Sequence, residues 1–432
     1  MQTADVVVIG AGVIGSATTL ELARRGRRVI CVDAGSGVGA GSTSSSSAII
    51  RFHYSTLDSV LTSWEAAALW DDFAGHLGVV DENGTAKFIR TGCLVFDFPG
   101  SNRDTVLSML ADVGIDYEEL TASEIHGRWP ALDVGDYWPP KSVDDPGFAD
   151  DAHGVLDGYY TPQAGFIDDP MLAACNLMNA ARHHGATLRL NSRVTEIRRS
   201  GGNVTGVTLA SGEQIDAPVV INVGGPFSKG LNRLAGVADE MRIGHGPMRQ
   251  EVHVAEGPAD FLMSDGVPIV TDVNVGTYFR PQLGNTILVG GTEPDCDPLE
   301  WVDDPAVYND LPTAEGFERS MLRLARRLPS LGIPHRPVGL AALYDASDDW
   351  VPIYDKTSLG GFFMACGSSG NQFKNAPLSG IFMAELVEAA ERGIDHDVTP
   401  VQYVGPRTGR AIDLGAFSRL RDKTVTSGTV LG

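Results

Sequence analysis

Basic residues are scarce in this chain. Its 432 residues include 33 Lys and Arg against 55 Asp and Glu, so the formal net charge is −22 at pH 7. A protein with this charge repels polyanions at long range. The composition therefore predicts no nucleic-acid partner and no docking to an anionic membrane surface.

Cysteine is scarce as well. The five cysteines are odd in number, lie far apart and never show the C-x-x-C spacing of zinc and redox motifs. We therefore expect a reducing compartment and no metal site. Each cysteine is expected to act as a small buried hydrophobic residue: Cys31, Cys93, Cys175, Cys296 and Cys366.

Long apolar runs are missing too. The opening MQTADVVVIGAGVIG has no basic leader, and glycines interrupt its apolar run too early for it to span a bilayer. With 43% apolar and 20% charged residues the chain has ordinary globular composition and enough length for two lobes with cores of their own. We expect a soluble, cytoplasmic protein without a membrane partner.

The first 33 residues predict a β-α-β unit. The apolar run after Asp5 is continuous, which is typical of a parallel strand buried on both faces. A helix is predicted over 13–25, with Gly26 as its stop, and a second strand over 27–33.

A dinucleotide fingerprint lies in this unit. Gly10, Gly12 and Gly15 form G-x-G-x-x-G between the first strand and the helix. These glycines allow a tight turn, a close approach of pyrophosphate and close packing of helix on strand, while Asp33 ends the second strand where an acid can bind a ribose. We predict a bound dinucleotide, with a glycine-rich turn of another α/β fold as the alternative. The motif by itself does not choose between NAD and FAD.

Similar strand signals recur further along the chain. One lies at 217–225 and another at 360–370. The stretch near 88–162 is rich in Asp, Pro and Trp, whereas the stretch near 240–338 alternates like half-buried antiparallel strands. Three nucleotide-domain pieces are thus separated by two inserts, which predicts two lobes that are both discontinuous in sequence.

Five segments carry a family resemblance. In chain order they read DVVVIGAGVIG, GSTSSSSAIIRFHYS, VVINVGGPFS, ALYDASDDWVPI and GSSGNQFKNAPLSG. Together they resemble the D-amino-acid oxidase superfamily of flavoproteins, and within it the sarcosine oxidase and dimethylglycine dehydrogenase branch. The resemblance covers the chain in order except for its last ~20 residues, and such an ordered set is more specific than any single motif.

The resemblance implies a two-lobed α/β (α+β) flavoprotein. A Rossmann-like FAD-binding domain is expected over 1–87, 163–239 and 339–415. A discontinuous substrate domain, built on a mixed and largely antiparallel sheet, is expected over 88–162 and 240–338. The polar residues 416–432 are expected to form a C-terminal tail that is an arm or a disordered end.

The serine run at 41–47 has two interpretations. Composition alone predicts a flexible linker. Its place beyond Asp33 and its match to the family instead imply that its small hydroxyl side chains serve the flavin pyrophosphate. The FAD-binding residues that the resemblance implies are Gly10, Gly12, Val13, Ile14, Gly15, Asp33, Ala34, Gly41, Ser42, Thr43, Ser44, Ser45, Ser46, Val194, Gly224, Gly225, Gly367, Ser369, Gly370, Asn371, Gln372 and Lys374.

Four side chains match those that hold a carboxylate substrate in the sarcosine oxidase branch. The resemblance implies that Arg51 and Lys374 bind the carboxylate, the arginine by a two-pronged fork. It also implies that Tyr278 and Tyr344 form walls of the pocket and offer hydroxyl donors.

Several departures from the family pattern refine these expectations. Relatives attach FAD through a histidine in the serine run or through a cysteine where this chain has Ala342, so FAD is expected to be non-covalent here. Leu288 stands where the resemblance to sarcosine oxidases implies a lysine that promotes reaction with oxygen. Its absence argues against an oxidase, so an electron acceptor other than oxygen is expected as an alternative to oxygen. Ala48 replaces a basic residue, and Thr292 and Asn371 replace histidines, so the pocket is not expected to be tuned for sarcosine itself.

The leading functional hypothesis is FAD-dependent oxidation of the C–N bond of a carboxylate-bearing amine, an N-methyl, secondary or D-amino acid, to an imine that hydrolyses. One alternative is an FAD-dependent 2-hydroxy acid dehydrogenase, because the same residues would bind its carboxylate. Another is the flavin subunit of a heteromeric amine-oxidising complex. A homo-oligomer or a partner subunit stays open, as does the role of His53 beside the arginine.

Overall fold

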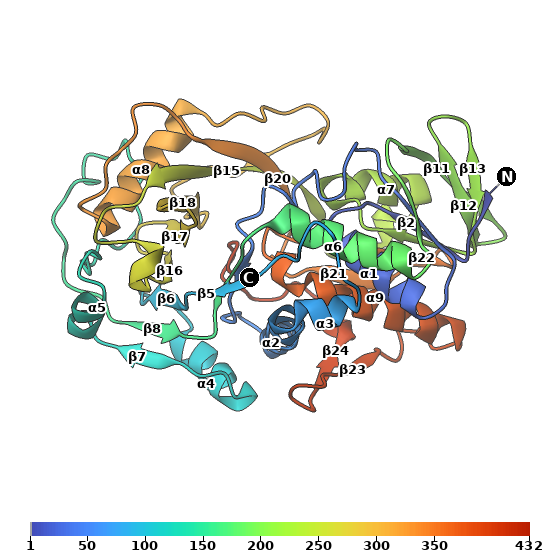
Figure 1. Ribbon diagram of the computed structural model, residues 1–432, viewed down its shortest axis with the longest axis horizontal. Helices are drawn as coiled ribbons and strands as arrows, with labels where there is room; N and C mark the ends of the chain where they lie inside the picture. The colour runs from blue at the N-terminus through green and yellow to red at the C-terminus, as the bar shows by residue number, and fades with distance from the viewer. Residues whose placement is uncertain (1) are drawn as a thin grey trace.

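The computed structural model describes residues 2–432, which form two lobes side by side (Figure 1). One lobe contains the N-terminal β-α-β unit, and the other contains a large sheet from the middle of the chain. The last residue of the sequence lies between the two lobes. Within residues 2–432, no helix is long and apolar enough to cross a membrane.

The first lobe is built on a six-stranded sheet of order β10-β3-β2-β14-β22-β21. Its strands run parallel except for β21, which is antiparallel to β22. The four central strands are buried at every position, as the continuous apolar runs predict. The strands are β2 (Val6–Ile9), β3 (Val29–Val32), β10 (Thr187–Arg189), β14 (Val219–Asn222), β21 (Ile353–Lys356) and β22 (Phe362–Cys366).

Three long helices pack together on this sheet. Helix α1 (Val13–Arg24) contacts both α6 (Pro170–His183) and α9 (Ala376–Glu391), and all three contribute to one hydrophobic core. The sequence explains where α6 begins, because the Asp169 side chain accepts a hydrogen bond from the Leu172 N–H. Next to them lie α2 (Leu57–Asp71), α3 (Phe73–Leu77) and, beside β14, α7 (Ser228–Ala235).

Smaller sheets complete this lobe. A four-stranded sheet has the order β1-β13-β12-β11, a three-stranded sheet the order β4-β9-β5, and a hairpin pairs β23 with β24. Their bounds are β1 (Gln2–Thr3), β4 (Ile49–Ile50), β5 (Phe88–Arg90), β9 (Gly165–Ile167), β11 (Val194–Ser200), β12 (Asn203–Leu209), β13 (Gln214–Asp216), β23 (Gln402–Val404) and β24 (Ala411–Asp413).

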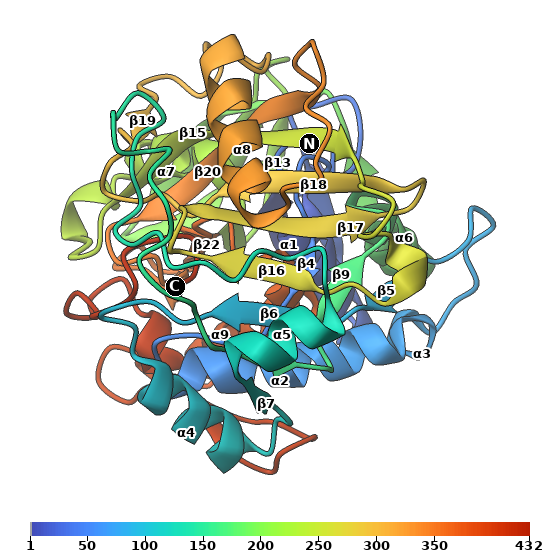
Figure 2. The same cartoon turned by 90° about the vertical axis from the view of Figure 1, so that its left-hand side faces the viewer.

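The second lobe is a nine-stranded, mixed sheet (Figure 2). Its order is β19-β15-β18-β17-β16-β6-β8-β7, with β20 paired to β15, and every pair except β16 with β6 is antiparallel. The strands are β6 (Cys93–Phe96), β7 (Glu118–Leu120), β8 (Gly158–Thr161), β15 (His245–Glu256), β16 (Ile269–Asp272), β17 (Thr277–Gln282), β18 (Thr286–Gly291), β19 (Glu300–Trp301) and β20 (Gly339–Ser347).

Helix α8 (Ala314–Arg327) crosses one face of this sheet, as Figure 2 shows. Its apolar side chains Phe317, Met321 and Leu324 are buried in the core of this lobe. This spacing places them on one side of the helix, and the Thr313 side chain accepts a hydrogen bond from the Gly316 N–H to start it. Helix α5 (Ala122–Arg128) also belongs to this lobe, whereas α4 (Arg103–Val113) packs against α2.

The predicted fold class is confirmed, with two differences from the sequence analysis. Strand β20 lies in a stretch expected for the FAD-binding domain, but it pairs with the large sheet along nine residues of β15. The domain boundaries themselves stay a prediction. For the tail 416–432, the alternative of a disordered end is wrong, because Arg419 is buried in ion pairs and Val430 and Leu431 are only 7% and 9% exposed.

Candidate functional site

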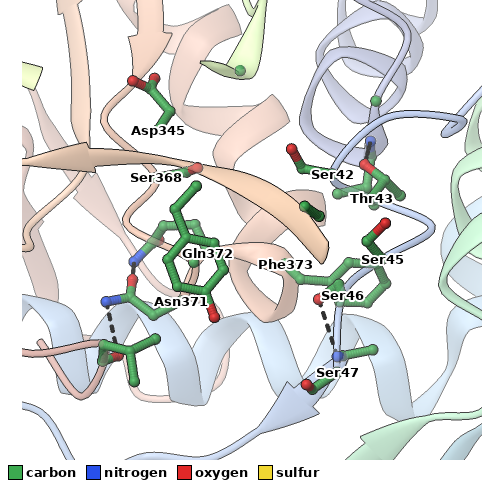
Figure 3. A pocket seen from close by; sticks show the side chains of 18 of the residues that line it. Ser42, Thr43, Ser45, Ser46, Ser47, Asp345, Ser368, Asn371, Gln372 and Phe373 are labelled. Atoms are coloured by element: carbon green, nitrogen blue, oxygen red, sulfur yellow. Dashed lines mark hydrogen bonds between the residues drawn. The ribbon is translucent and has the colours of Figure 1, made fainter. Parts of the chain in front are cut away.

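Residues of both lobes line one cavity, part of which Figure 3 shows from close by. One wall is the serine run, and the opposite wall is the loop after β22 with Asn371 and Gln372. Residues from β15, β17 and β20 add a third side. Of the predicted site residues, those that line it are Gly12, Val13, Ile14, Gly15, Ser42, Thr43, Ser45, Ser46, Arg51, Gly225, Tyr278, Tyr344, Gly370, Asn371, Gln372 and Lys374.

The other predicted residues do not line this cavity. They are Gly10, Asp33, Ala34, Gly41, Ser44, Val194, Gly224, Gly367 and Ser369. Val194 pairs with Leu209 in the four-stranded sheet, and its side chain belongs to a hydrophobic core, so its side chain is that of an ordinary strand residue.

The glycines of the fingerprint are required by close backbone packing. Gly10 has φ +116°, and a Cβ there would lie 2.3 Å from the Val223 carbonyl oxygen. A Cβ on Gly15 would lie 1.9 Å from the Gly10 carbonyl oxygen. No side chain fits at either position, so the start of α1 can approach both β14 and a ligand closely.

Asp33 and Thr43 hold the loop that enters α1. The Asp33 carboxylate accepts the Ala11 N–H on one oxygen and the Gly35 N–H on the other, each at 2.6 Å. The Thr43 hydroxyl accepts the Val13 N–H at 3.0 Å. Each carboxylate oxygen has a second lone pair. These residues therefore fit a dinucleotide whose ribose lies beside Asp33 and whose pyrophosphate lies at the helix N-terminus.

The loop after β22 is fixed by a buried acid. One Asp345 carboxylate oxygen accepts the Gly367 N–H at 2.7 Å, and the other lies 2.7 Å from Nδ1 of buried His245. Burial by itself lowers the pKa of His245, but Asp345 raises it well above its usual range. Within residues 2–432, one group of three or more potential metal ligands has all its ligand atoms within 4.8 Å of one another. It consists of His245, Asp345 and Cys366. Asp345 and His245 are already paired with each other, so we assign this group to structure.

Two glycines make room for the rings of Tyr278 and Tyr344. Gly290 is not among the predicted site residues, and Gly370 is predicted to bind FAD. A Cβ on Gly290 would lie 2.5 Å from the Tyr278 hydroxyl oxygen, and a Cβ on Gly370 would lie 2.3 Å from Cζ of Tyr344. Each tyrosine ring thus lies against a glycine. The Tyr278 hydroxyl is also 2.7 Å from the Ser47 hydroxyl, which joins the β17 wall to the serine run.

Two buried cations lie in the cavity lining. Arg51 is 4% exposed and Lys374 is 3% exposed. Lys374 Nζ donates to the Tyr54 hydroxyl and to the Asn371 carbonyl, both at 2.8 Å, and burial together with nearby Arg51 holds its pKa well below its usual range. Among residues 2–432, no carboxylate lies within 4.0 Å of either cation. The site therefore carries positive charge that no acidic side chain balances.

His53 is buried beside these cations but does not line the cavity. Its ring meets Tyr159 edge to face at 6.3 Å, and neither ring nitrogen has a hydrogen-bond partner within the described chain. Burial first, and then Arg51 and Lys374, lower its pKa well below its usual range. A neutral packing histidine fits these contacts.

The sequence analysis missed residues that the tertiary structure brings to the cavity. Val430 and Leu431 line it, although nothing in the sequence marks them. Glu293 does not itself line the cavity, but it follows β18 with φ +48° and accepts, at 2.9 Å, the N–H of Val430, which does. The sequence signal for Glu293 is an acid two residues after an apolar strand, in GGTEP.

The chain is similar to known proteins over most of its length. The family described as FAD dependent oxidoreductase (DAO) matches residues 5–386. Glycine oxidase of Geobacillus kaustophilus is 24% identical over 404 residues, covering 90% of this chain and 94% of that protein. Sarcosine oxidase subunit beta of Rhodobacter capsulatus is 25% identical over 389 residues, covering 89% of this chain and 84% of that subunit.

Solved structures show the same fold. L-proline dehydrogenase from P. horikoshii matches with a TM-score of 0.74 and 21% identity, over 90% of this chain and 94% of that one. Glycine oxidase from Geobacillus kaustophilus matches with a TM-score of 0.73 and 21% identity, over 98% and 100%.

A Rossmann-like lobe, a mixed-sheet lobe and a dinucleotide cradle between them define a two-lobed flavoprotein oxidoreductase. The chain belongs to the FAD dependent oxidoreductase (DAO) family. Its similarity to sarcosine oxidase and sarcosine dehydrogenase sequences places it near that branch, as the five segments predict.

Proposed function

We propose that this flavoenzyme oxidises the C–N bond of an amine that also bears a carboxylate. The observation that carries the proposal is the pair of buried cations in the cavity lining, Arg51 and Lys374, which have no acidic partner in residues 2–432. A buried cation is stable only with a counter-charge or with many hydrogen bonds, and a substrate carboxylate supplies both. Relatives named glycine oxidase and sarcosine oxidase agree with this chemistry.

The protein residues bind and orient the substrate. Arg51 and Lys374 hold the carboxylate, and the rings of Tyr278 and Tyr344 enclose the reacting carbon and nitrogen and exclude water. FAD, when bound, takes the electron pair that leaves the substrate. The amine thereby loses two electrons and two protons and becomes an imine, which water hydrolyses to a carbonyl compound and a smaller amine or ammonia.

Anaerobic reduction of the flavin tests this function. Purified holoprotein is mixed with N-methyl, cyclic and D-amino acids and, in parallel, with the matching 2-hydroxy acids, and the loss of flavin absorbance is followed. Bleaching by amino acids is expected. Bleaching by hydroxy acids alone would replace the proposal by a 2-hydroxy acid dehydrogenase, and bleaching by neither class would refute it.

The flavin is proposed to bind without a covalent link. The two positions that carry the link in relatives are Ser44–Ser47 and Ala342, and neither offers a nucleophilic nitrogen or sulfur. Cys366 is the one cysteine that lines the cavity. Acid precipitation is expected to release all flavin into the supernatant, and a yellow precipitate would contradict this and point to Cys366.

Slow reaction of the reduced flavin with oxygen is also proposed. Leu288 packs against Val252 and Tyr278, on the sheet face that carries this tyrosine, and it brings no positive charge to stabilise developing superoxide. Reoxidation by air is expected to be much slower than reoxidation by a quinone or dye acceptor. Rates that are equal or faster with oxygen would overturn this part and define an oxidase.

A partner subunit is the second candidate, because the chain is similar to sarcosine oxidase subunit beta over most of its length. If the protein alone is reduced by an amino acid and turns over with a dye, it needs no partner. If reduction occurs only after a second protein is added, the chain is the flavin subunit of a complex.

A further inference from the structure

Residues 430–432 occupy the carboxylate end of the cavity. Arg51 Nη2 donates to the carbonyl oxygens of Val430 and Leu431, each at 2.8 Å. The Asn371 amide donates to the Val430 carbonyl at 3.2 Å, and the Ser55 hydroxyl donates to the Gly432 carbonyl at 2.7 Å. This segment therefore lies where the proposed function places a substrate carboxylate.

These contacts use the part of Arg51 that a carboxylate needs. Arg51 Nη1 donates to the His53 carbonyl, and both Nη2 protons are taken by the segment. A two-pronged grip on a carboxylate uses Nη2 together with either Nε or Nη1. The arginine cannot grip a substrate in this way until the carbonyl groups of Val430 and Leu431 leave it.

The backbone N–H of Val430 also has a distinct partner. One Glu293 carboxylate oxygen accepts the Val430 N–H at 2.9 Å, while the other oxygen is buried without a hydrogen-bond partner in the described chain. Glu293 is 9% exposed and lies close enough to Tyr278 and Tyr344 to raise the pKa of both hydroxyls, after the larger effect of burial. Glu293 thus adjoins the two tyrosine walls.

Val430 consequently presents the two groups of an α-amino acid in the right order. Its N–H faces an acid, and its carbonyl, one Cα away, faces an arginine and an amide. We infer that Val430 is an internal stand-in for the substrate and that Glu293 is the residue that binds the substrate amine while Arg51 binds its carboxylate. This inference rests on the proposed function and narrows its substrate to an α-amino acid.

The segment can leave without unfolding what precedes it. Arg421 forms a two-pronged ion pair with buried Asp349 at 2.8 and 2.9 Å, and the Thr426 hydroxyl donates to the Asp349 carbonyl. Ser427 and Gly428 follow and are exposed, with φ +70° at the glycine. An anchor at 421–426 and an exposed joint at 427–428 let residues 430–432 swing out when a substrate enters.

Charge favours this exchange. The segment offers Arg51 neutral carbonyl groups, whereas an amino acid offers Arg51 a carboxylate and offers Glu293 an ammonium group. Hydrogen bonds between charged partners are about twice as strong as neutral ones. A hydroxyl in place of the ammonium group brings no charge to Glu293, so the site prefers amino acids to hydroxy acids.

Two ligands that cannot be oxidised separate the two subsites. 2-Aminoisobutyrate has no hydrogen on its α-carbon, and isobutyrate is the same skeleton without the amine. Their dissociation constants are measured from the change in flavin absorbance of the holoprotein. Glu293→Gln is expected to weaken 2-aminoisobutyrate about tenfold or more and to leave isobutyrate within about twofold. Glu256→Gln, at an exposed acid of β15, is the matched control and is expected to change neither.

Removing the segment tests the competition. A chain that stops at Thr429 is expected to bind both ligands about tenfold more tightly, because Arg51 is then free. Val430→Lys keeps the chain length and should have the same effect, since a lysine is repelled by Arg51 and Lys374. Val425→Lys, at a residue that is 85% exposed, is its control. The effect of Glu293→Gln on both dissociation constants is also measured in the shortened chain, where residues 430–432 cannot compete with the ligands.

The outcomes separate this inference from the proposed function. If Glu293→Gln affects both ligands equally or neither, Glu293 does not bind the amine. If the shortened chain and Val430→Lys bind the ligands no more tightly, the segment is a fixed wall and no substrate mimic. In both cases a loss of binding in Arg51→Ala leaves the proposed function intact, whereas unchanged binding of both ligands in Arg51→Ala refutes the carboxylate site itself.

Discussion

At the scale of the residue, the site is defined by charges that lack a protein partner. Arg51 and Lys374 are buried cations without an acid, and Glu293 is a buried acid that lies within 4.0 Å of no Lys, Arg or His side chain in residues 2–432. Separately, each is unfavourable, because burial removes its hydration. An amino acid carries the complementary pair of charges: its carboxylate balances the cations, and its ammonium group favours the ionised form of Glu293, which burial disfavours.

Arg51 can be tested with a substitution that keeps its charge. Arg51→Lys removes the planar fork but retains a cation. We expect the dissociation constant of a carboxylate ligand to rise about tenfold or more, because hydrogen bonds to a charged group contribute roughly 1.5–3 kcal/mol. Flavin content should not change. A loss of flavin with ligand affinity intact would show that Arg51 serves the cofactor.

Glu293 predicts a pH dependence of stability. Burial raises the pKa of its carboxyl from 4.5 to about 8, with a further contribution from Asp297. A raised carboxyl pKa means that the folded protein favours the protonated form, so this contribution to stability is fully present below pH 4.5 and is lost as the pH rises through about 8. The groups facing it are the Val430 N–H, Tyr278, Tyr344 and Asp297.

Thermal melts between pH 5 and pH 9 check this expectation. Glu293→Gln should melt near the parent at pH 5 and progressively above it as the pH rises to 9, because glutamine does not ionise. A constant difference between the two proteins across this range would show that Glu293 does not titrate there.

At the scale of the element, the junction of β2 and α1 is the most constrained part of the site. Gly10 combines φ +116° with a carbonyl oxygen of Val223 that leaves no room for a Cβ. Gly26, after the same helix, has φ +80° but nothing within 4 Å of a Cβ. A comparison of the two positions distinguishes the free energy that a left-handed backbone costs from the free energy that a steric clash costs.

Alanine substitutions at these glycines give different expectations. Gly26→Ala should lower the free energy of unfolding by about 1–2 kcal/mol, the cost of a left-handed residue, and leave FAD affinity unchanged. Gly10→Ala should lower it further and weaken FAD binding, because the loop must move away from β14. Flavin content and denaturant unfolding measure both effects. Equal effects at the two positions would contradict the role of the Val223 contact.

At the scale of the whole molecule, the cavity joins the two lobes. Its lining combines α1 and the serine run of one lobe with strands β15, β17 and β20 of the other. A ligand that fills such a cavity binds only the folded, closed arrangement. Strand β20 strengthens this link, because it pairs with β15 and its last residues reach the loop after β22.

FAD should therefore stabilise the protein in proportion to its concentration. A ligand that binds only the folded state contributes about 2.7 kcal/mol at a concentration 100 times its dissociation constant. Apoprotein titrated with FAD should show one melting transition whose midpoint keeps rising beyond one equivalent. Two transitions, with only one of them moving, would show that FAD stabilises a single lobe.

The sequence by itself determined the dinucleotide cradle and the class of fold. Gly10, Gly12, Gly15 and Asp33 lie within one β-α-β unit, where local backbone rules fix their relative positions. The resemblance also indicated Arg51, Lys374, Tyr278 and Tyr344, and all four line one cavity, although their roles stay predictions.

Only the tertiary structure decided what surrounds these four residues. Arg51 and Leu431 are 380 positions apart, and Val430 meets Glu293 across 137 positions. Val430 and Leu431 contact Arg51 through their backbone carbonyls. Every residue has a backbone carbonyl, so no pattern of side chains in the sequence could predict these contacts. The path of the chain through space, and not the identity of these residues, placed an amino-acid-like backbone in the site.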